Sequence, residues 1–407
     1  MTAAALAPIG ILLLVACLIA MLTRRLGLPY IVGLVVAGLL IALLPNAPKL
    51  PLSRELIFNI LLPPLVFEAA LQLDWRRFRN ELPLTLTLAF LGVGIGATTV
   101  AAGLHYLTGW SWIGAALFGV LIAATDPVSV IAAFREMGAE KRLSMVVESE
   151  SLLNDGAAAV GFAVLLSIAN GGSHGVETSM VTFLWATGGG VLTGLLISGA
   201  TLLIAGKTDD HLIEITLTTI AAYSSFLIAE HFHASGVIAA LSCGLLVGSV
   251  SAMGVISDDD RPYVLSFWEY VAFLANSLIF ILIGMNTANQ ELRELGSLSA
   301  AAAIGLVFVG RIVSIYPLAL IFTRSRWRLP MAYQHTLFWG GLRGALALAL
   351  ALAVPDSVPE RSLIVTTAFV VVAFSILVQG LTMPWLLKHY NLAERTSGPA
   401  PADPAIN

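Results

Sequence analysis

Thirteen apolar runs of membrane length divide almost the whole chain, and this pattern constrains the fold more than any other feature. Each run approaches the roughly 17–25 residues that an α-helix needs to cross a bilayer. Backbone groups in lipid must be satisfied within the protein, so we expect an all-α polytopic membrane protein with thirteen transmembrane helices. The predicted spans are residues 4–22, 29–44, 55–73, 83–107, 111–134, 144–169, 178–205, 211–230, 234–252, 262–285, 297–322, 330–353 and 362–387.

The composition agrees with a membrane environment. Hydrophobic residues make up 58% of the 407 residues and charged residues 11%, whereas a soluble domain carries about 25% charge. Cys17 and Cys243 lie in apolar runs and offer neither a disulfide framework nor a metal-binding spacing. We therefore expect membrane lipid as the surroundings, no cofactor and no nucleic-acid partner.

The distribution of basic residues predicts an orientation. With thirteen spans and the N-terminus outside, fifteen of the 21 Lys and Arg residues fall on the cytoplasmic side and four outside. The other two, Arg311 and Arg343, lie within spans. Because basic residues accumulate in cytoplasmic loops, we predict a multi-pass protein of a bacterial-type inner or plasma membrane with its C-terminus in the cytoplasm.

Several ionisable residues lie near the middle of their predicted spans. Asp155, Arg311 and Arg343 are central, and Asp126 and Glu68 lie about one helical turn from the centre. A charge at that depth costs at least ~2.5 kcal/mol, so it is normally kept for function. Charges that converge on one depth indicate an ion site at the membrane midplane.

The fifth predicted span contains a helix-breaking proline beside one of these acids. Pro127 has no N–H, so the carbonyls of Ala123 and Ala124 are predicted to lose their helical partners. Freed backbone is tolerated in a membrane where it faces protein or a wet cavity. Together with the Thr125 hydroxyl and the Asp126 carboxylate, these carbonyls are oxygen donors suited to an alkali cation.

The twelfth predicted span has a matching interruption at residues 340–344, which contain three glycines and Arg343. Two interrupted helices at corresponding positions are typical of secondary transporters built from inverted repeats. Arg343 is predicted to neutralise the facing C-terminal ends of the half-helices and to help balance Asp126.

This repeat pattern predicts how the chain is divided. Two triplets of spans form the two halves of a core, residues 83–170 and 297–390. The other spans lie in residues 1–82 and 171–296, and the second of these parts begins with a linker span. Residues 391–407 are expected to form a short disordered tail.

The sixth predicted span carries two acids on neighbouring faces. Ser151 and Asp155 are four residues apart and share one face, which we expect to look at Asp126. Glu150 points elsewhere and needs a buried partner, since an unpaired buried charge is very costly. Arg311 is the natural candidate, so we assign a structural role to this pair and a transport role to Asp155.

Asn154 and Glu68 complete the predicted set. Asn154 shares a face with Glu150, and its neutral amide is suited to orienting a carboxylate such as Glu68. For Glu68 the alternative is a hydrogen-bonded acid with a purely structural role.

The motifs resemble one family over nearly the whole chain. Their residues are Leu62–Ala70, Thr125–Pro127, Glu150–Gly156 and Gly340–Ala345. In this ordered set the sequence resembles the cation/proton antiporter 1 family, which comprises bacterial NhaP-type sodium/proton antiporters and the membrane domain of animal sodium/proton exchangers.

The resemblance implies roles for individual residues. Asp155 is expected to bind Na⁺ or a proton in alternation, with co-ligands at Asp126, Thr125 and Ser151. Asn154 and Glu68 are expected beside them, and Glu150 with Arg311 as a core salt bridge. The resemblance also implies a homodimer and a part in pH homeostasis. It further implies that the core transport domain moves, elevator-like, against a dimerisation domain whose two parts are residues 1–82 and 171–296. The pair Asn154-Asp155, in place of two aspartates, implies electroneutral exchange of one cation for one proton.

Three other functions fit parts of the pattern. A K⁺/H⁺ antiporter would use the same architecture, because ion selectivity depends on sub-ångström cavity size. An intramembrane aspartyl protease also needs two midplane aspartates, but the sequence lacks a Gly-x-Gly-Asp motif at either one. A cation channel could line a continuous pore with these acids, whereas paired helix interruptions favour alternating access.

Overall fold

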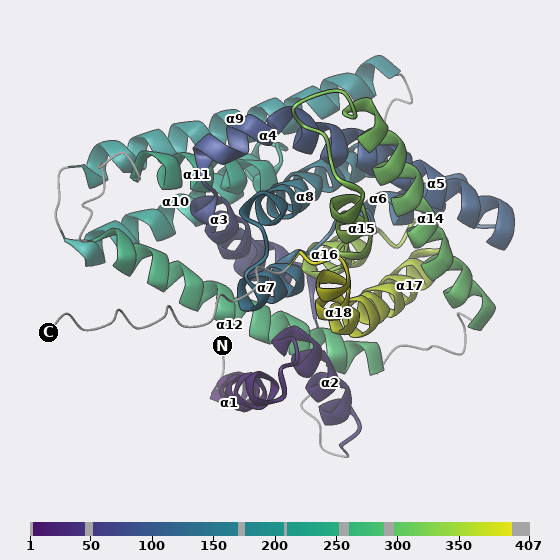
Figure 1. Ribbon diagram of the computed structural model, residues 1–407, viewed down its shortest axis with the longest axis horizontal. Helices are drawn as coiled ribbons and strands as arrows, with labels where there is room; N and C mark the ends of the chain where they lie inside the picture. The colour runs from purple at the N-terminus through teal and green to yellow at the C-terminus, as the bar shows by residue number, and fades with distance from the viewer. Residues whose placement is uncertain are drawn as a thin grey trace, which may run out of the picture.

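A computed structural model of the chain describes residues 3–44, 52–169, 176–206, 210–251, 260–288 and 297–392, and in these residues it contains helices and no strands. Each of the thirteen predicted spans coincides with a helix, with a helix continued through a π-helical segment (η), or with two half-helices (Figure 1). The helices before the first interruption are α1 (Ala3–Leu26), α2 (Tyr30–Ala42), η1 (Leu56–Leu61), α3 (Leu62–Gln72), α4 (Trp75–Leu86), η2 (Thr87–Leu91), α5 (Gly92–Thr108) and α6 (Trp112–Leu121). The helices after it are α7 (Val128–Met137), α8 (Lys141–Ala169), α9 (Val176–Ala205), α10 (His211–His231), α11 (Gly236–Ser251), α12 (Arg261–Ala288), α14 (Ser297–Ile321), α15 (Met331–Trp339), α16 (Ala345–Leu352), α17 (Arg361–Phe374), η3 (Ser375–Gly380) and α18 (Leu381–His389).

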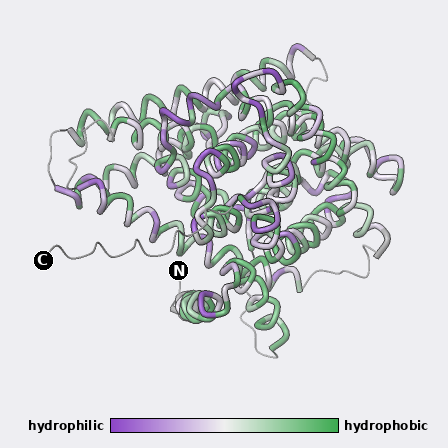
Figure 2. Tube along the Cα trace, viewed as in Figure 1, coloured by the Kyte–Doolittle hydropathy of each residue, from purple (hydrophilic) through white to green (hydrophobic). Residues whose placement is uncertain are grey.

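Eight helical segments in the described residues are long and apolar enough to cross a membrane. They are Ile9–Leu26, Trp75–Thr108, Lys141–Ala169, Glu177–Ala205, His211–His231, Arg261–Ala288, Ser299–Ile321 and Arg361–His389. Hydrophobic residues predominate along most of the helices (Figure 2). The predicted class, an all-helical polytopic membrane protein, is therefore confirmed.

The fourth predicted span begins earlier in the structure than in the sequence analysis. Residues 75–82, expected as a cytoplasmic loop, are the first turns of a helix that runs to Thr108. The carboxylate of Asp74 caps this helix by accepting hydrogen bonds from the N–H groups of Arg76 (2.9 Å) and Arg77 (3.2 Å). Hydropathy detects the apolar part of a helix and misses polar turns that extend beyond it.

The helices pack in two groups. In the first, α12 packs on α2, and α11 packs on α3, α9 and α10; in the second, α5 packs on α6 and α14. In Figure 1 the first group occupies the top, left and lower part of the view, with α9 along the upper edge, and the second group occupies the right. Gly38 and Gly284 bring α2 and α12 into close contact, since a methyl group on either would overlap the backbone of the other helix.

Both predicted interruptions are present, and they contact each other. Residues 122–127 separate α6 from α7, and residues 340–344 separate α15 from α16. The backbone N–H of Asp126 donates a hydrogen bond to the carbonyl of Leu342 (2.7 Å). Two segments that are far apart in the sequence thus meet where neither is helical.

Candidate ion-binding site

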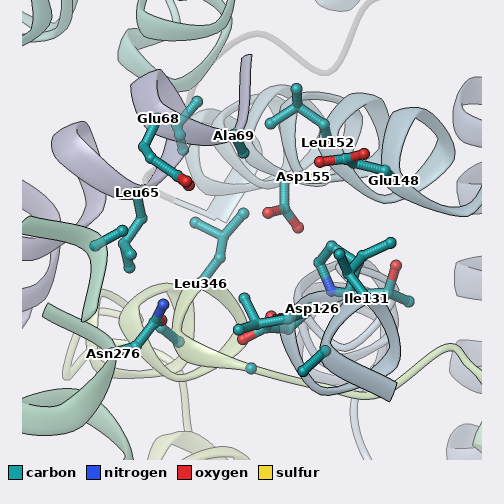
Figure 3. A pocket seen from close by; sticks show the side chains of 18 of the residues that line it. Leu65, Glu68, Ala69, Asp126, Ile131, Glu148, Leu152, Asp155, Asn276 and Leu346 are labelled. Atoms are coloured by element: carbon teal, nitrogen blue, oxygen red, sulfur yellow. Dashed lines mark hydrogen bonds between the residues drawn. The ribbon is translucent and has the colours of Figure 1, made fainter. Parts of the chain in front are cut away.

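A cavity of about 410 Å³ opens on one side of the paired interruptions, between α3, α7, α8, α12 and α16 (Figure 3). Its walls are mostly apolar, with side chains such as Leu65, Ile131 and Leu346. The charged residues that line it are Glu68, Asp126, Arg135, Glu148, Asp155 and Glu269. An apolar chamber with a few convergent carboxylates has the make-up of a site for a small ligand.

The carboxylate of Asp155 faces this cavity from α8, and Asp126 faces it from the first interruption (Figure 3). One oxygen of Asp155, Oδ1, is buried and accepts no hydrogen bond from the described residues. Buried polar atoms in native proteins almost always have a partner. An acceptor left over beside a cavity is therefore suited to a proton or to a bound cation.

Asp126 is held firmly by the backbone around it. Its Oδ1 atom accepts a hydrogen bond from the N–H of Val128 (2.9 Å), at the start of α7. A methyl group on Gly344 would overlap the Asp126 carboxylate, so the second interruption can approach only because residue 344 has no side chain. The glycines at 340–344 therefore help to place Asp126.

Two residues of α8 form hydrogen bonds with Thr125. The Asn154 amide accepts a hydrogen bond from the Thr125 N–H (3.1 Å) and donates one to the Thr125 hydroxyl (2.6 Å). The Ser151 hydroxyl donates to the Thr125 carbonyl and lies 3.0 Å from the Thr125 hydroxyl. Thr125 lines the cavity, whereas Ser151 and Asn154 do not.

The predicted link between Asn154 and Glu68 is not present. The remaining N–H of Asn154 donates to Glu150 (3.3 Å), while Glu68 accepts a hydrogen bond from Gln72. The physical reason is local, because Glu150 lies one turn before Asn154 on the same helix face. Glu68 itself lines the cavity together with Asp126 and Asp155.

The opposite side of the interruptions is occupied by two arginines. Arg311 contacts Glu150 (Nη1 to Oε1, 2.9 Å) and donates to the carbonyl of Leu337 in the last turn of α15 (2.6 Å). Arg343 donates to the carbonyls of Ala123 (2.8 Å) and Ala124 (3.1 Å), which follow the end of α6.

These are the two carbonyls that the sequence predicts Pro127 to release, and the two residues of the predicted Glu150–Arg311 pair are in contact. Each arginine therefore lies at the C-terminal end of one half-helix, where a cation is favoured by the helix dipole. The capping of α15 by Arg311 was not predicted.

Residues outside the predicted ligand set also line the cavity. Gln72, Arg135, Glu148 and Glu269 all line it. Glu148 is seven residues before Asp155, a spacing that places both on one helix face. Arg135 resembles any cytoplasmic basic residue in the sequence, and nothing in its neighbourhood indicates a cavity.

Comparison with known proteins identifies similar sequences and folds. The family described as sodium/hydrogen exchanger, transmembrane, matches residues 11–389. The chain is 40% identical over 372 residues to the low-affinity Na⁺/H⁺ antiporter NhaS1 of Synechocystis, covering 90% of this chain and 70% of that protein. It is 35% identical over 345 residues to the Na⁺/H⁺ antiporter NhaP of Pseudomonas aeruginosa, covering 82% and 81% of the two chains. The structure of the sodium proton antiporter MjNhaP1 from Methanocaldococcus jannaschii at pH 8 shares the fold, with a TM-score of 0.75, 21% identity and coverage of 97% of this chain and 99% of that chain.

Proposed function

Because the chain belongs to the sodium/hydrogen exchanger family, we propose that it exchanges Na⁺ or Li⁺ for H⁺ at Asp155 and Asp126. It is a transporter and not an enzyme, and it spans the membrane several times. The observation that carries the assignment to these residues is a buried Asp155 oxygen that accepts no hydrogen bond from the described residues, beside a cavity shared with Asp126.

Competition for one site explains how the two ions are coupled. A carboxyl group in apolar surroundings carries a proton when no cation is present, and an arriving Na⁺ stabilises the ionised form and displaces that proton. If the loaded forms of the site cross the membrane and the empty charged form does not, each cation moves only in exchange for a proton. The empty, negatively charged site then does not cross the low-dielectric interior of the membrane, where an unbalanced charge is very costly.

The predicted ligands fall into two groups, residues that line the cavity and residues that hold Thr125 in place. Asp155, Asp126 and Thr125 line the cavity and are the proposed Na⁺ ligands, and Glu68 lines its wall. Ser151, predicted as a ligand from the sequence, is bonded to Thr125, and Asn154 holds the same residue from the other side. We assign both the task of aiming Thr125 at the cavity; Ser151 would reach the cation only after turning its hydroxyl away from the Thr125 carbonyl.

The finer architecture is part of the same proposal. It comprises thirteen spans, inverted repeats with a crossing pair of interrupted helices, an outside N-terminus and a homodimer. The core domain, residues 83–170 and 297–390 together with the first turns of its opening helix at residues 75–82, would move as an elevator against the rest of residues 1–82 and residues 171–296. The closer packing within each helix group than between the groups supports this division.

The proposal includes electroneutral exchange of one cation for one proton, and the neutral residue beside Asp155 supports it. The residue before Asp155 is the neutral Asn154, so Asp155 has no second carboxylate directly beside it in the sequence. The Asn154 amide forms hydrogen bonds with Thr125 and Glu150. The buried Glu150 is paired with Arg311 and does not line the cavity.

The test is exchange in proteoliposomes with an acidic interior and a trapped pH-sensitive dye. Na⁺, Li⁺ and K⁺ are added in turn outside, with and without valinomycin at fixed K⁺ to hold the voltage. Alkalinisation by Na⁺ or Li⁺ that is insensitive to the clamped voltage is the expected result. A response to K⁺ alone would make the protein a K⁺/H⁺ antiporter, and a response that follows the voltage without a pH gradient would make it a channel.

A further inference from the structure

A chain of hydrogen bonds joins α7 to α3 at the wall of the cavity. The guanidinium of Arg135, in the last turn of α7, donates to Gln72 Oε1 (2.8 Å). Gln72, at the end of α3, donates from Nε2 to Glu68 Oε1, one turn earlier on the same helix. All three residues line the cavity that holds Asp126 and Asp155.

Arg135 fixes the donor and acceptor roles in these two hydrogen bonds. An arginine side chain has N–H donors and no acceptor, so Gln72 must turn its amide oxygen toward Arg135. The amide nitrogen of Gln72 is then left to face Glu68, where it can only donate. Arg135 thereby determines which group Glu68 receives and holds the Glu68 carboxylate on the cavity wall.

We propose that Arg135 is a positioning residue for cation binding, acting through Gln72 on Glu68. The inference rests on the proposed antiport function and extends it by one residue that does not itself touch the ion. Since α7 begins directly after Asp126 and Pro127, Arg135 also links the place of Asp126 to that of Glu68. These two hydrogen bonds therefore hold the Glu68 carboxylate in place for an arriving cation.

A simpler effect of Arg135 would have the opposite sign. Arg135 is the one basic side chain among the charged residues that line the cavity, whose other members are acidic. If it acted only through space, it would repel an arriving Na⁺, and its removal would strengthen cation binding. If it positions Glu68, its removal weakens binding, because the carboxylate loses its orientation.

The experiment compares single and paired variants in proteoliposomes. Arg135→Gln and Gln72→Leu are each expected to raise the KM for Na⁺ roughly three- to tenfold, the range for losing one hydrogen bond, with the maximal rate within about twofold. The double variant should be no worse than the more affected single one, because both break the same chain. Arg135→Lys, which keeps a charge and a donor, should recover part of the loss. In a Glu68→Gln background neither substitution should shift the KM further.

Arg79→Gln is the matched control, because Arg79 is exposed and does not line the cavity. It removes one positive charge and should leave the KM unchanged. A lower KM in Arg135→Gln, or effects of Arg135→Gln and Gln72→Leu that add in the double variant, would overturn the proposal while leaving the antiport function intact. An unchanged KM in both single variants would do the same. Absence of exchange in the wild-type protein would instead overturn the function on which the proposal rests.

Discussion

The two sides of the paired helix interruptions carry opposite charges and are built in opposite ways. On one side, Asp126 and Asp155 share a cavity of about 410 Å³, and an Asp155 oxygen has no partner among the described residues. On the other, Arg311 and Arg343 border a cavity of about 20 Å³ and donate to backbone carbonyls and Glu150. Their Nε groups are buried and lie without a hydrogen-bond partner in the described part of the chain.

The difference shows how the paired helix interruptions provide an ion site on one side and stabilising arginines on the other. Interrupting a helix releases carbonyls on one side of the break and allows a side chain from the other segment to approach. The arginines satisfy the released carbonyls, which makes the interruptions stable in an apolar interior. The acids, in contrast, retain an unused acceptor, which is what an exchangeable ion requires.

The largest effect is expected at the acidic side. Asp155→Asn should abolish pH-gradient-driven Na⁺ uptake into proteoliposomes, because the amide can neither carry the proton nor balance the cation. Its folding should be unaffected, as judged by thermal unfolding in detergent. Glu148→Gln is the matched control on the same helix and in the same cavity, and it should retain exchange. Appreciable uptake by Asp155→Asn would remove Asp155 from the centre of the mechanism.

On the arginine side, a substitution should lower the stability of the protein. Arg311→Met leaves Glu150 buried without its charge partner and should lower the free energy of unfolding by about 3–5 kcal/mol. Replacing both, as Arg311→Met with Glu150→Leu, should recover most of that loss, because two apolar side chains need no partner. Thermal unfolding in detergent measures both. A stable Arg311→Met protein that has lost exchange would place Arg311 in the transport site instead.

An intermediate effect is expected where the two interruptions meet. Gly344→Ala introduces a methyl group into the space of the Asp126 carboxylate, so Asp126 must move. Exchange should fall by roughly tenfold, an amount that corresponds to ~1.4 kcal/mol, with folding retained. Gly94→Ala is the control, since nothing lies within 4 Å of the added carbon there. Equal activity of the two variants would show that the place of Asp126 is not critical.

The smallest effect is expected at Ser151, which helps to hold Thr125 in place. Ser151→Ala removes one of the hydrogen bonds that hold Thr125 and should raise the KM for Na⁺ by roughly two- to fivefold without changing the maximal rate. Complete loss of exchange would mean that Ser151 binds the ion directly, as the sequence alone suggests. Initial rates over a range of Na⁺ concentrations separate the two outcomes.

Sequence reasoning succeeded where one residue determines its own surroundings. Pro127 predicts which carbonyls lose their partners, and burial of Glu150 predicts a basic partner, for which depth in the membrane selects Arg311. It failed for the contact between Asn154 and Glu68, because spacing along a helix gives a face and not the neighbour across it. The same limit hides the hydrogen bond from Arg135 to Gln72, because these two residues come from helices that are far apart in the sequence.

The most direct test of the central claim is proton release on cation binding. Purified protein in weakly buffered detergent solution, with a pH indicator, is mixed with NaCl or with choline chloride as the control. If Na⁺ and H⁺ compete for Asp155, Na⁺ should release protons from the wild-type protein, more Na⁺ should be needed at lower pH, and Asp155→Asn should release none. Equal release from Asp155→Asn, or Na⁺ binding without proton release, would contradict the account.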